Sequence, residues 1–187
     1  MRKIIYAHMV SLDGYIEGPK GELDWSAPGE ELHKHFNDLY LDGVIDTSIY
    51  GRRLYELMAS YWPTVDKNSS VPDVEKEFAR VWMKLPKIVH SKTLEQVDHN
   101  STLVSEVVPE DIQKLKEQPG GDMDVGGAEL ASAFMKNGLI DEYRLYIHPV
   151  ILGGGKPYFP PDITLKLRLV GTREFSCGVV MLQYVNA

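Results

Sequence analysis

Along the first two thirds of this chain, short apolar segments typical of buried strands alternate with longer segments that have the apolar period of helices. Leu32, Phe36 and Leu39 fall on one face of a helix, and a later run that ends before Pro86 has the same period. The strands expected here comprise residues 3–10, 44–49, 87–90, 103–108 and 123–125. Because parallel neighbours need a crossover connection, strands separated by helices predict a mainly parallel sheet with helices on both faces.

The last third of the chain contains strand-like segments that no helical segment separates. Residues 142–152, 165–175 and 179–185 have the alternation of strands, and Ser176 to Gly178 joins the last two as in a hairpin. With 187 residues and 43% apolar composition, the chain can bury one substantial core. We therefore expect a single α/β domain over residues 1–187, in which an antiparallel C-terminal hairpin completes the sheet.

Charge and cysteine content exclude several classes of protein. A formal net charge of −7 argues against a general nucleic-acid or anionic-membrane binder. Cys177 is the only cysteine, which excludes an internal disulfide and a cysteine-based zinc site. No run reaches the roughly 20 apolar residues of a membrane span, and the N-terminal run stops at Ser11 without a cleavage pattern. We expect a cytoplasmic protein that acts on a small-molecule substrate, and a homodimer is compatible with the sequence.

Three junctions at the ends of expected strands carry residues that suit a phosphate group. They combine glycines that let a ligand approach the backbone, N–H groups at a helix start, and cationic or hydroxyl side chains. The residues are Gly51, Arg52 and Arg53; His90, Ser91 and Lys92; and Gly126 and Gly127. Each junction alone is also compatible with a tight or polar turn that binds nothing. Together they favour a ligand with several phosphates beyond the carboxyl ends of the strands.

The order of several short motifs resembles that of a known superfamily. SLDGYI follows the first strand, LDW precedes a helix, and YGRRLYE, KIVHSKT, DVGGAEL and HPVILGGGKPYF follow in turn. In this order they resemble the dihydrofolate reductase-like superfamily, and more closely the reductase domain at the C-terminus of bifunctional riboflavin-biosynthesis deaminase/reductases and its stand-alone relatives. The resemblance covers essentially the whole chain. It implies an NADPH-dependent reductase with the three-layer α/β fold of dihydrofolate reductase.

The resemblance also implies positions for the parts of NADPH. The residues expected at the cofactor phosphates are Gly51, Arg52, Arg53, Gly126, Gly127, Ala128, Glu129 and Leu130. Those expected at the adenosine end, with its 2′-phosphate, are His90, Ser91 and Lys92. Met9 and Ile16, which flank the SLDG turn, are expected near the nicotinamide.

The substrate stays open, because the sequence departs from the riboflavin-pathway reductases where these contact their substrate. They carry a lysine four residues before the serine of SLDG, where this chain has Ala7, and no segment resembles the one that binds their substrate phosphate. Reduction also needs a proton, which a shielded carboxyl group with a raised pKa could relay through water. Asp13 and Glu31 are the candidates. Glu30 fits the second position equally well, either glutamate can simply favour a helix start, and Asp13 can simply fix its turn.

The resemblance thus implies hydride transfer from NADPH to a C=N or C=O group of a small heterocycle, as in 5-amino-6-(5-phosphoribosylamino)uracil reductase or dihydrofolate reductase. Two other interpretations remain open. A non-catalytic NADP-binding module of the same fold would bind the dinucleotide without turnover. A structural or partner-binding domain would have no affinity for it.

Overall fold

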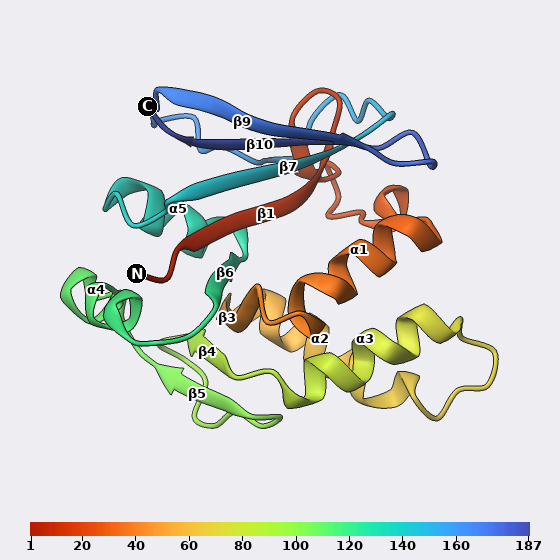
Figure 1. Cartoon of the computed structure of the whole chain (residues 1–187), viewed down its shortest axis with the longest axis horizontal. Coiled ribbons are helices and arrows are strands. Elements are labelled where there is room, and N and C mark those ends of the chain that lie inside the picture. Colours follow the sequence, from red (N-terminus) through yellow and green to blue (C-terminus); the bar gives the residue numbers. More distant parts are fainter.

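The computed structural model describes every residue from Met1 to Ala187 and places eight strands in one sheet, in the order β5-β4-β3-β6-β1-β7-β10-β9 (Figure 1). The parallel strands are β1 (Ile4–Ser11), β3 (Ile45–Gly51), β4 (Lys87–His90), β5 (Ser101–Val104), β6 (Asp122–Gly126) and β7 (Glu142–His148). The hairpin strands β9 (Leu167–Glu174) and β10 (Val180–Asn186) are antiparallel, and β10 pairs with β7. The mainly parallel sheet with an antiparallel C-terminal hairpin is confirmed.

Helices on both faces of the sheet complete a three-layer arrangement. On one side, α1 (Glu30–Leu41), α2 (Arg52–Val65) and α3 (Asp73–Lys84) pack together, as Figure 1 shows. The other side carries α4 (Pro109–Glu117) and α5 (Ala128–Lys136). A short 3₁₀ helix, η1 (Asp24–Ser26), precedes α1, and a separate ribbon pairs β2 (Tyr15–Glu17) with β8 (Lys156–Pro157). No helix is both long and apolar enough to span a bilayer.

The alternation of side chains along β6 separates the core from the opposite face of the sheet. Met123 and Val125 are buried in the main core, together with Ile4 of β1 and Phe134 of α5. Because successive side chains of a strand point to opposite faces, Asp124, between them, points away from this core. An acidic residue is thereby directed toward the layer of α1, α2 and α3.

The parallel strands β1, β3, β4 and β6 all end at the same edge of the sheet. The helices α2 and α5 begin directly after β3 and β6 at that edge. In open α/β sheets, ligands bind outside the carboxyl ends of the strands. The fold therefore brings two of the three predicted phosphate-binding junctions to adjacent positions, with the third, after β4, beside them.

Candidate active site

Two helices begin side by side at the carboxyl edge of the sheet, and neither has a side-chain cap at its N-terminus. The N-terminus of α2 follows Gly51, and that of α5 follows Gly127. A Cβ atom on Gly127 would lie 3.7 Å from the backbone nitrogen of Gly51, so the two N-termini are in contact. Uncapped N–H groups and the positive ends of the helix dipoles both favour an anion. The pair suits two linked phosphate groups.

The two glycines of the DVGG motif are required for different reasons. Gly127 has φ of +98°, a backbone conformation that residues with a Cβ rarely adopt. A Cβ atom on Gly126 would overlap with the side chain of Leu54 and lie 3.1 Å from the ring of Tyr50. Packing between β6, β3 and α2 therefore explains Gly126. This packing requires no ligand at Gly126, and the contact of either glycine with a ligand stays a prediction.

Both arginines of the GRR motif lie in the first turn of α2 and are exposed to solvent. Arg53 approaches the carboxylate of Glu17 to 3.5 Å. It lies at a polar hollow whose wall comprises residues 17–21, Arg53 and residues 155–157. Neither guanidinium is buried in an ion pair, so both remain able to contact phosphate oxygens.

The first turn of α5 contributes mainly its backbone to this site. Ala128 has no polar side chain, and Leu130 is buried in the core. The side chain of Glu129 is exposed, and its carboxylate lies 3.9 Å from Nζ of Lys156. An acidic side chain cannot bind a phosphate directly, so only the N–H groups of these residues fit the predicted role.

The third junction, after β4, is built differently from the prediction. Oγ of Ser91 accepts hydrogen bonds from the N–H groups of Thr93 and Leu94, at 3.1 and 3.0 Å, and so closes its own turn. Nζ of Lys92 lies 3.0 Å from a carboxylate oxygen of Glu106. This ion pair was not predicted from the sequence. Both side chains of this ion pair are exposed. An adenosine 2′-phosphate would therefore have to compete with Glu106 for Lys92.

His90 lies at the end of β4 and is only 9% exposed. Neither of its ring nitrogens has a hydrogen-bond partner. Burial lowers the pKa of this imidazole, so it is neutral at neutral pH and offers one donor and one acceptor.

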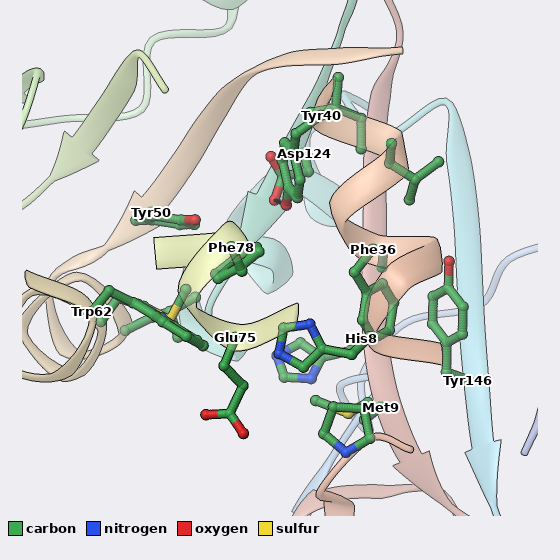
Figure 2. A pocket seen from close by; sticks show the side chains of 18 of the residues that line it. His8, Met9, Phe36, Tyr40, Tyr50, Trp62, Glu75, Phe78, Asp124 and Tyr146 are labelled. Carbon is green, nitrogen blue, oxygen red and sulfur yellow. Dashed lines mark hydrogen bonds between the residues drawn. The ribbon is translucent and has the colours of Figure 1, made fainter. Parts of the chain in front are cut away.

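A cavity of about 510 Å³ opens between the sheet and the layer of α1, α2 and α3 (Figure 2). Met9 of β1 and Gly126 of β6 belong to its wall, so the cavity adjoins the paired helix N-termini. Its volume falls within the range of roughly 300–1,000 Å³ that is usual for small-molecule sites. Most of the wall is hydrophobic, and its aromatic residues are Phe36, Tyr40, Tyr50, Tyr61, Trp62, Phe78 and Tyr146.

Asp124 is the acidic group on the sheet side of this cavity. Its carboxylate accepts hydrogen bonds from Oγ of Ser48 at 2.5 Å and from the hydroxyl of Tyr40 at 3.4 Å. Its position deep in the molecule raises its pKa from 3.8 to about 6, against the opposing effect of Ser48. The sequence analysis missed this residue. The signal was visible, because a carboxylate within the short buried strand MDV has to face something other than the core.

Three further polar residues of the wall were also not expected at a site. Glu75 enters from α3 and accepts a hydrogen bond from the hydroxyl of Tyr61 at 3.0 Å. The imidazoles of His8 and His33 come from β1 and α1. Figure 2 shows Glu75 and Asp124 on opposite sides of Phe78.

Neither of the two predicted catalytic carboxyl groups, Asp13 and Glu31, lines the cavity, so the structure does not support the catalytic role predicted for them. The carboxylate of Asp13 accepts hydrogen bonds from Ser11 Oγ at 2.7 Å and from the N–H groups of Leu152 and Gly153 at 3.1 and 2.7 Å. These bonds lower its pKa, whereas a proton donor needs a raised one. Asp13 joins the SLDG turn to the GGG loop.

Glu31 has a comparable structural role at the start of α1. Its carboxylate accepts a hydrogen bond from the N–H group of Ser176 at 2.8 Å and lies 3.4 Å from Arg173. These contacts with the C-terminal hairpin lower its pKa. The alternative, Glu30, is exposed and does not line the cavity either.

The two residues expected at the nicotinamide are separated by the fold. Met9 is half-buried and lines the cavity. Ile16 is 3% exposed and belongs to the main core. Its side chain is absent from the cavity wall, so of the two only Met9 lines the cavity, and its contact with the nicotinamide stays a prediction.

Known proteins resemble this chain in sequence and in fold. Residues 2–181 match the RibD C-terminal domain family. The uncharacterized protein YyaP of Bacillus subtilis is 41% identical over 186 residues, which cover 98% of this chain and 94% of YyaP.

Two solved structures share the fold at low sequence identity. The diaminohydroxyphosphoribosylaminopyrimidine deaminase/5-amino-6-(5-phosphoribosylamino)uracil reductase of Thermotoga maritima is 16% identical with a TM-score of 0.66, and all of this chain covers 57% of it. The dihydrofolate reductase of Enterococcus faecalis, complexed with NADP(H), is 15% identical with a TM-score of 0.64, over 98% of this chain and 96% of that enzyme. The fold is thus of the dihydrofolate reductase type, and the chain belongs to the RibD C-terminal domain family.

Proposed function

We propose that this protein is a reductase that uses NADPH to transfer hydride to a C=N or C=O group of a small heterocyclic substrate. The observation that carries the proposal is the junction of two features at Gly126 and Gly127. A pair of uncapped helix N-termini, which suits a pyrophosphate, opens into an aromatic cavity large enough for a nicotinamide and a substrate ring. The family of the chain and the NADP(H) complex of a structural neighbour support the same assignment.

The residues of this chain fit such a dinucleotide. The N–H groups that follow Gly51 and Gly127 would hold the pyrophosphate, and Arg52 and Arg53 would neutralise part of its charge. When bound, the nicotinamide supplies the hydride. The aromatic wall would exclude water from the reacting groups, and Met9 would contact one face of the nicotinamide ring.

The preference for NADPH over NADH depends on the surroundings of Lys92. Its ammonium group, with Arg52 and Arg53, supplies the positive charge near the ends of β3 and β4. Glu106 offsets part of this charge. We therefore expect a preference for NADPH that is smaller than a site without Glu106 would give.

A titration and a turnover assay test the proposal. NADPH and NADH would be titrated into the purified protein while the tryptophan fluorescence is recorded, because Trp62 lies in the cavity wall. NADPH oxidation would then be followed with a panel of pteridines, aminopyrimidines and small quinones. Saturable NADPH binding with oxidation by one class of acceptor supports the proposal. Binding without oxidation by any of them would indicate the non-catalytic NADP-binding module, and no binding would overturn both.

A further inference from the structure

The side chains that line the cavity include no lysine and no arginine. Its carboxyl groups are those of Asp124 and Glu75, and its imidazoles are those of His8 and His33. Burial lowers the pKa of His8, so that this imidazole is neutral at neutral pH. The cavity therefore presents carboxyl and imidazole groups to a ligand, and no permanent positive charge.

A phosphate group inside this cavity would have no cationic partner and would share the space with two carboxyl groups. It would lose its hydration without compensation, and the like charges would repel each other. The cationic side chains nearby lie outside the cavity, where Arg53 and Lys156 line the separate polar hollow. This distribution leaves phosphate binding to the cofactor and favours an unphosphorylated ligand in the cavity.

The shape and composition of the wall favour a flat ring. Phe36, Tyr50, Trp62 and Phe78 bring aromatic faces or edges to the cavity from α1, β3, α2 and α3 (Figure 2). The rings of Trp62 and Phe78 are in edge-to-face contact, with centroids 4.5 Å apart, which holds each in a fixed orientation. A planar aromatic ligand can stack on such a wall.

Asp124 has acceptor positions left for further hydrogen bonds. Ser48 and Tyr40 each donate one hydrogen bond to it, whereas an ionised carboxylate has about four acceptor positions. The remaining positions can take adjacent N–H donors of a ligand as a bidentate pair.

His33 provides a second, independent indication of a polar ligand. This imidazole is 9% exposed, lines the cavity, and has an Nδ1 atom without any hydrogen-bond partner. A buried ring nitrogen without a partner is unfavourable, and a ligand with a polar edge would satisfy it.

We propose that the substrate is a planar nitrogen heterocycle that carries adjacent N–H donors and no phosphate group, and that Asp124 binds those donors. The inference rests on the proposed function, since it assigns the substrate class to the same site. An aminopyrimidine or aminopteridine ring has the required shape and N–H donors, whereas the phosphate of a phosphoribosyl group would have no lysine or arginine partner in the cavity.

A matched pair of ligands tests the substrate class on the unaltered protein. Hydroxymethylpterin and its phosphate ester differ only in the phosphate group, and the affinity of each for the NADPH-saturated protein would be measured by calorimetry. We expect the phosphate ester to bind at least about tenfold more weakly than the alcohol. Equal or tighter binding of the ester would overturn the proposal that the cavity rejects phosphate.

A matched pair of variants tests the role of Asp124. Asp124→Asn keeps the size of the side chain but converts one acceptor oxygen into a donor, so we expect hydroxymethylpterin to bind about tenfold or more weakly. Asp122→Asn makes the same change on the same strand outside the cavity, and we expect less than a twofold effect. Equal affinities in Asp124→Asn and the unaltered protein would overturn the assignment of Asp124.

NADPH affinity, measured separately for each protein, distinguishes the two proposals. If the unaltered protein does not bind NADPH, the proposed function fails. If it binds and oxidises NADPH while the pterin and its phosphate ester bind alike, only the substrate class fails. Thermal unfolding of both variants identifies any loss of binding that is due to misfolding.

Discussion

Asp124 is a residue whose burial works against the stability of the fold. Its pKa is raised to about 6 because the ionised carboxylate is poorly solvated in the interior, and the hydrogen bond from Ser48 compensates only in part. Its neighbours on β6, Met123 and Val125, are fully buried in the core and raise no such difficulty. Strongly shifted ionisable groups in a cavity are typical of functional sites, where stability is lost in favour of activity.

Asp124→Asn is therefore expected to stabilise the protein at neutral pH. The folded protein keeps a proton on Asp124 that the unfolded chain loses between about pH 4 and pH 6, so the free energy of unfolding falls as the pH rises through this interval. The variant has no carboxyl group at this position, so its free energy of unfolding does not fall in this way. We expect its free energy of unfolding to exceed that of the unaltered protein by about 1–3 kcal/mol near pH 7.5 and to equal it near pH 4.

Denaturant titrations at the two pH values measure this difference. The titratable groups that share the cavity with Asp124 are His8, His33, Tyr40, Tyr50, Tyr61, Glu75 and Tyr146. They are present in both proteins, so their contributions largely cancel in the comparison. A variant that is less stable at both pH values would show that the hydrogen bonds of the carboxylate outweigh its burial.

The pair of Lys92 and Glu106 leads to a prediction for cofactor preference. Glu106→Gln frees the ammonium group for the adenosine 2′-phosphate, and Lys92→Met removes it. Because both side chains are exposed, each change should alter the dissociation constant of NADPH by about twofold to fivefold, in opposite directions. NADH should be unaffected by either change, since it lacks the phosphate. Fluorescence titrations at low and moderate salt check this, and parallel shifts of both cofactors would contradict it.

At the start of α5, Gly127 has an unusual backbone conformation and also lies at a predicted ligand contact. Gly138 has a similar conformation without that contact, so a comparison of the two glycines separates backbone strain from loss of ligand binding. Gly127 before α5 and Gly138 after it both have positive φ, at +98° and +64°. A Cβ atom on Gly138 would meet nothing within 4 Å, whereas one on Gly127 would lie against Gly51 between the two helix N-termini. Both positions disfavour alanine, but only the first adjoins the predicted phosphate site.

Gly127→Ala and Gly138→Ala are both expected to lower the free energy of unfolding, by about 1–3 kcal/mol each, because alanine rarely adopts positive φ. Only Gly127→Ala should also weaken NADPH binding, by about tenfold or more, since the added methyl group lies 3.7 Å from the backbone nitrogen of Gly51, at the start of α2 where the phosphate is expected. The folded fraction is measured by chemical denaturation, and the dissociation constant by fluorescence at a temperature where both variants are folded. Similar NADPH affinities in the two variants would show that phosphate does not approach Gly127.

The order of strands and helices could be predicted from the sequence because it depends on local apolar patterns, as at β1, β3 and α5. The ribbon of β2 and β8 was not predicted, since each strand is too short to show an alternation and its partner lies far away along the chain. The same limit applies to Asp13. Of its three hydrogen-bond partners, Ser11 is nearby in SLDG, but Leu152 and Gly153 are about 140 residues away, and nothing in SLDG indicates them.

The cavity could not be predicted as a whole, because its wall combines side chains of β1, β3, β6 and three helices. The predicted phosphate site combines the starts of α2 and α5. Helix α2 therefore contributes to the cavity as well as to the predicted phosphate site. A dinucleotide that occupies the two regions would contact segments from the first strand to the fifth helix. The unfolded chain presents none of these arrangements, so such a ligand binds only the folded protein.

This coupling leads to a prediction for thermal stability. A ligand that binds only the folded state at about 100 times its dissociation constant adds about 2.7 kcal/mol to the free energy of unfolding. For a chain of this length, 1 kcal/mol corresponds to about 2–4 °C, so NADPH should raise the melting temperature by about 5–10 °C. NADH at the same concentration should raise it less, and inorganic pyrophosphate at matched ionic strength, the control, should raise it least because it occupies only the helix N-termini. Differential scanning fluorimetry over a series of ligand concentrations provides the measurement. An unchanged melting temperature with NADPH at every concentration would leave only a structural or partner-binding role for the fold.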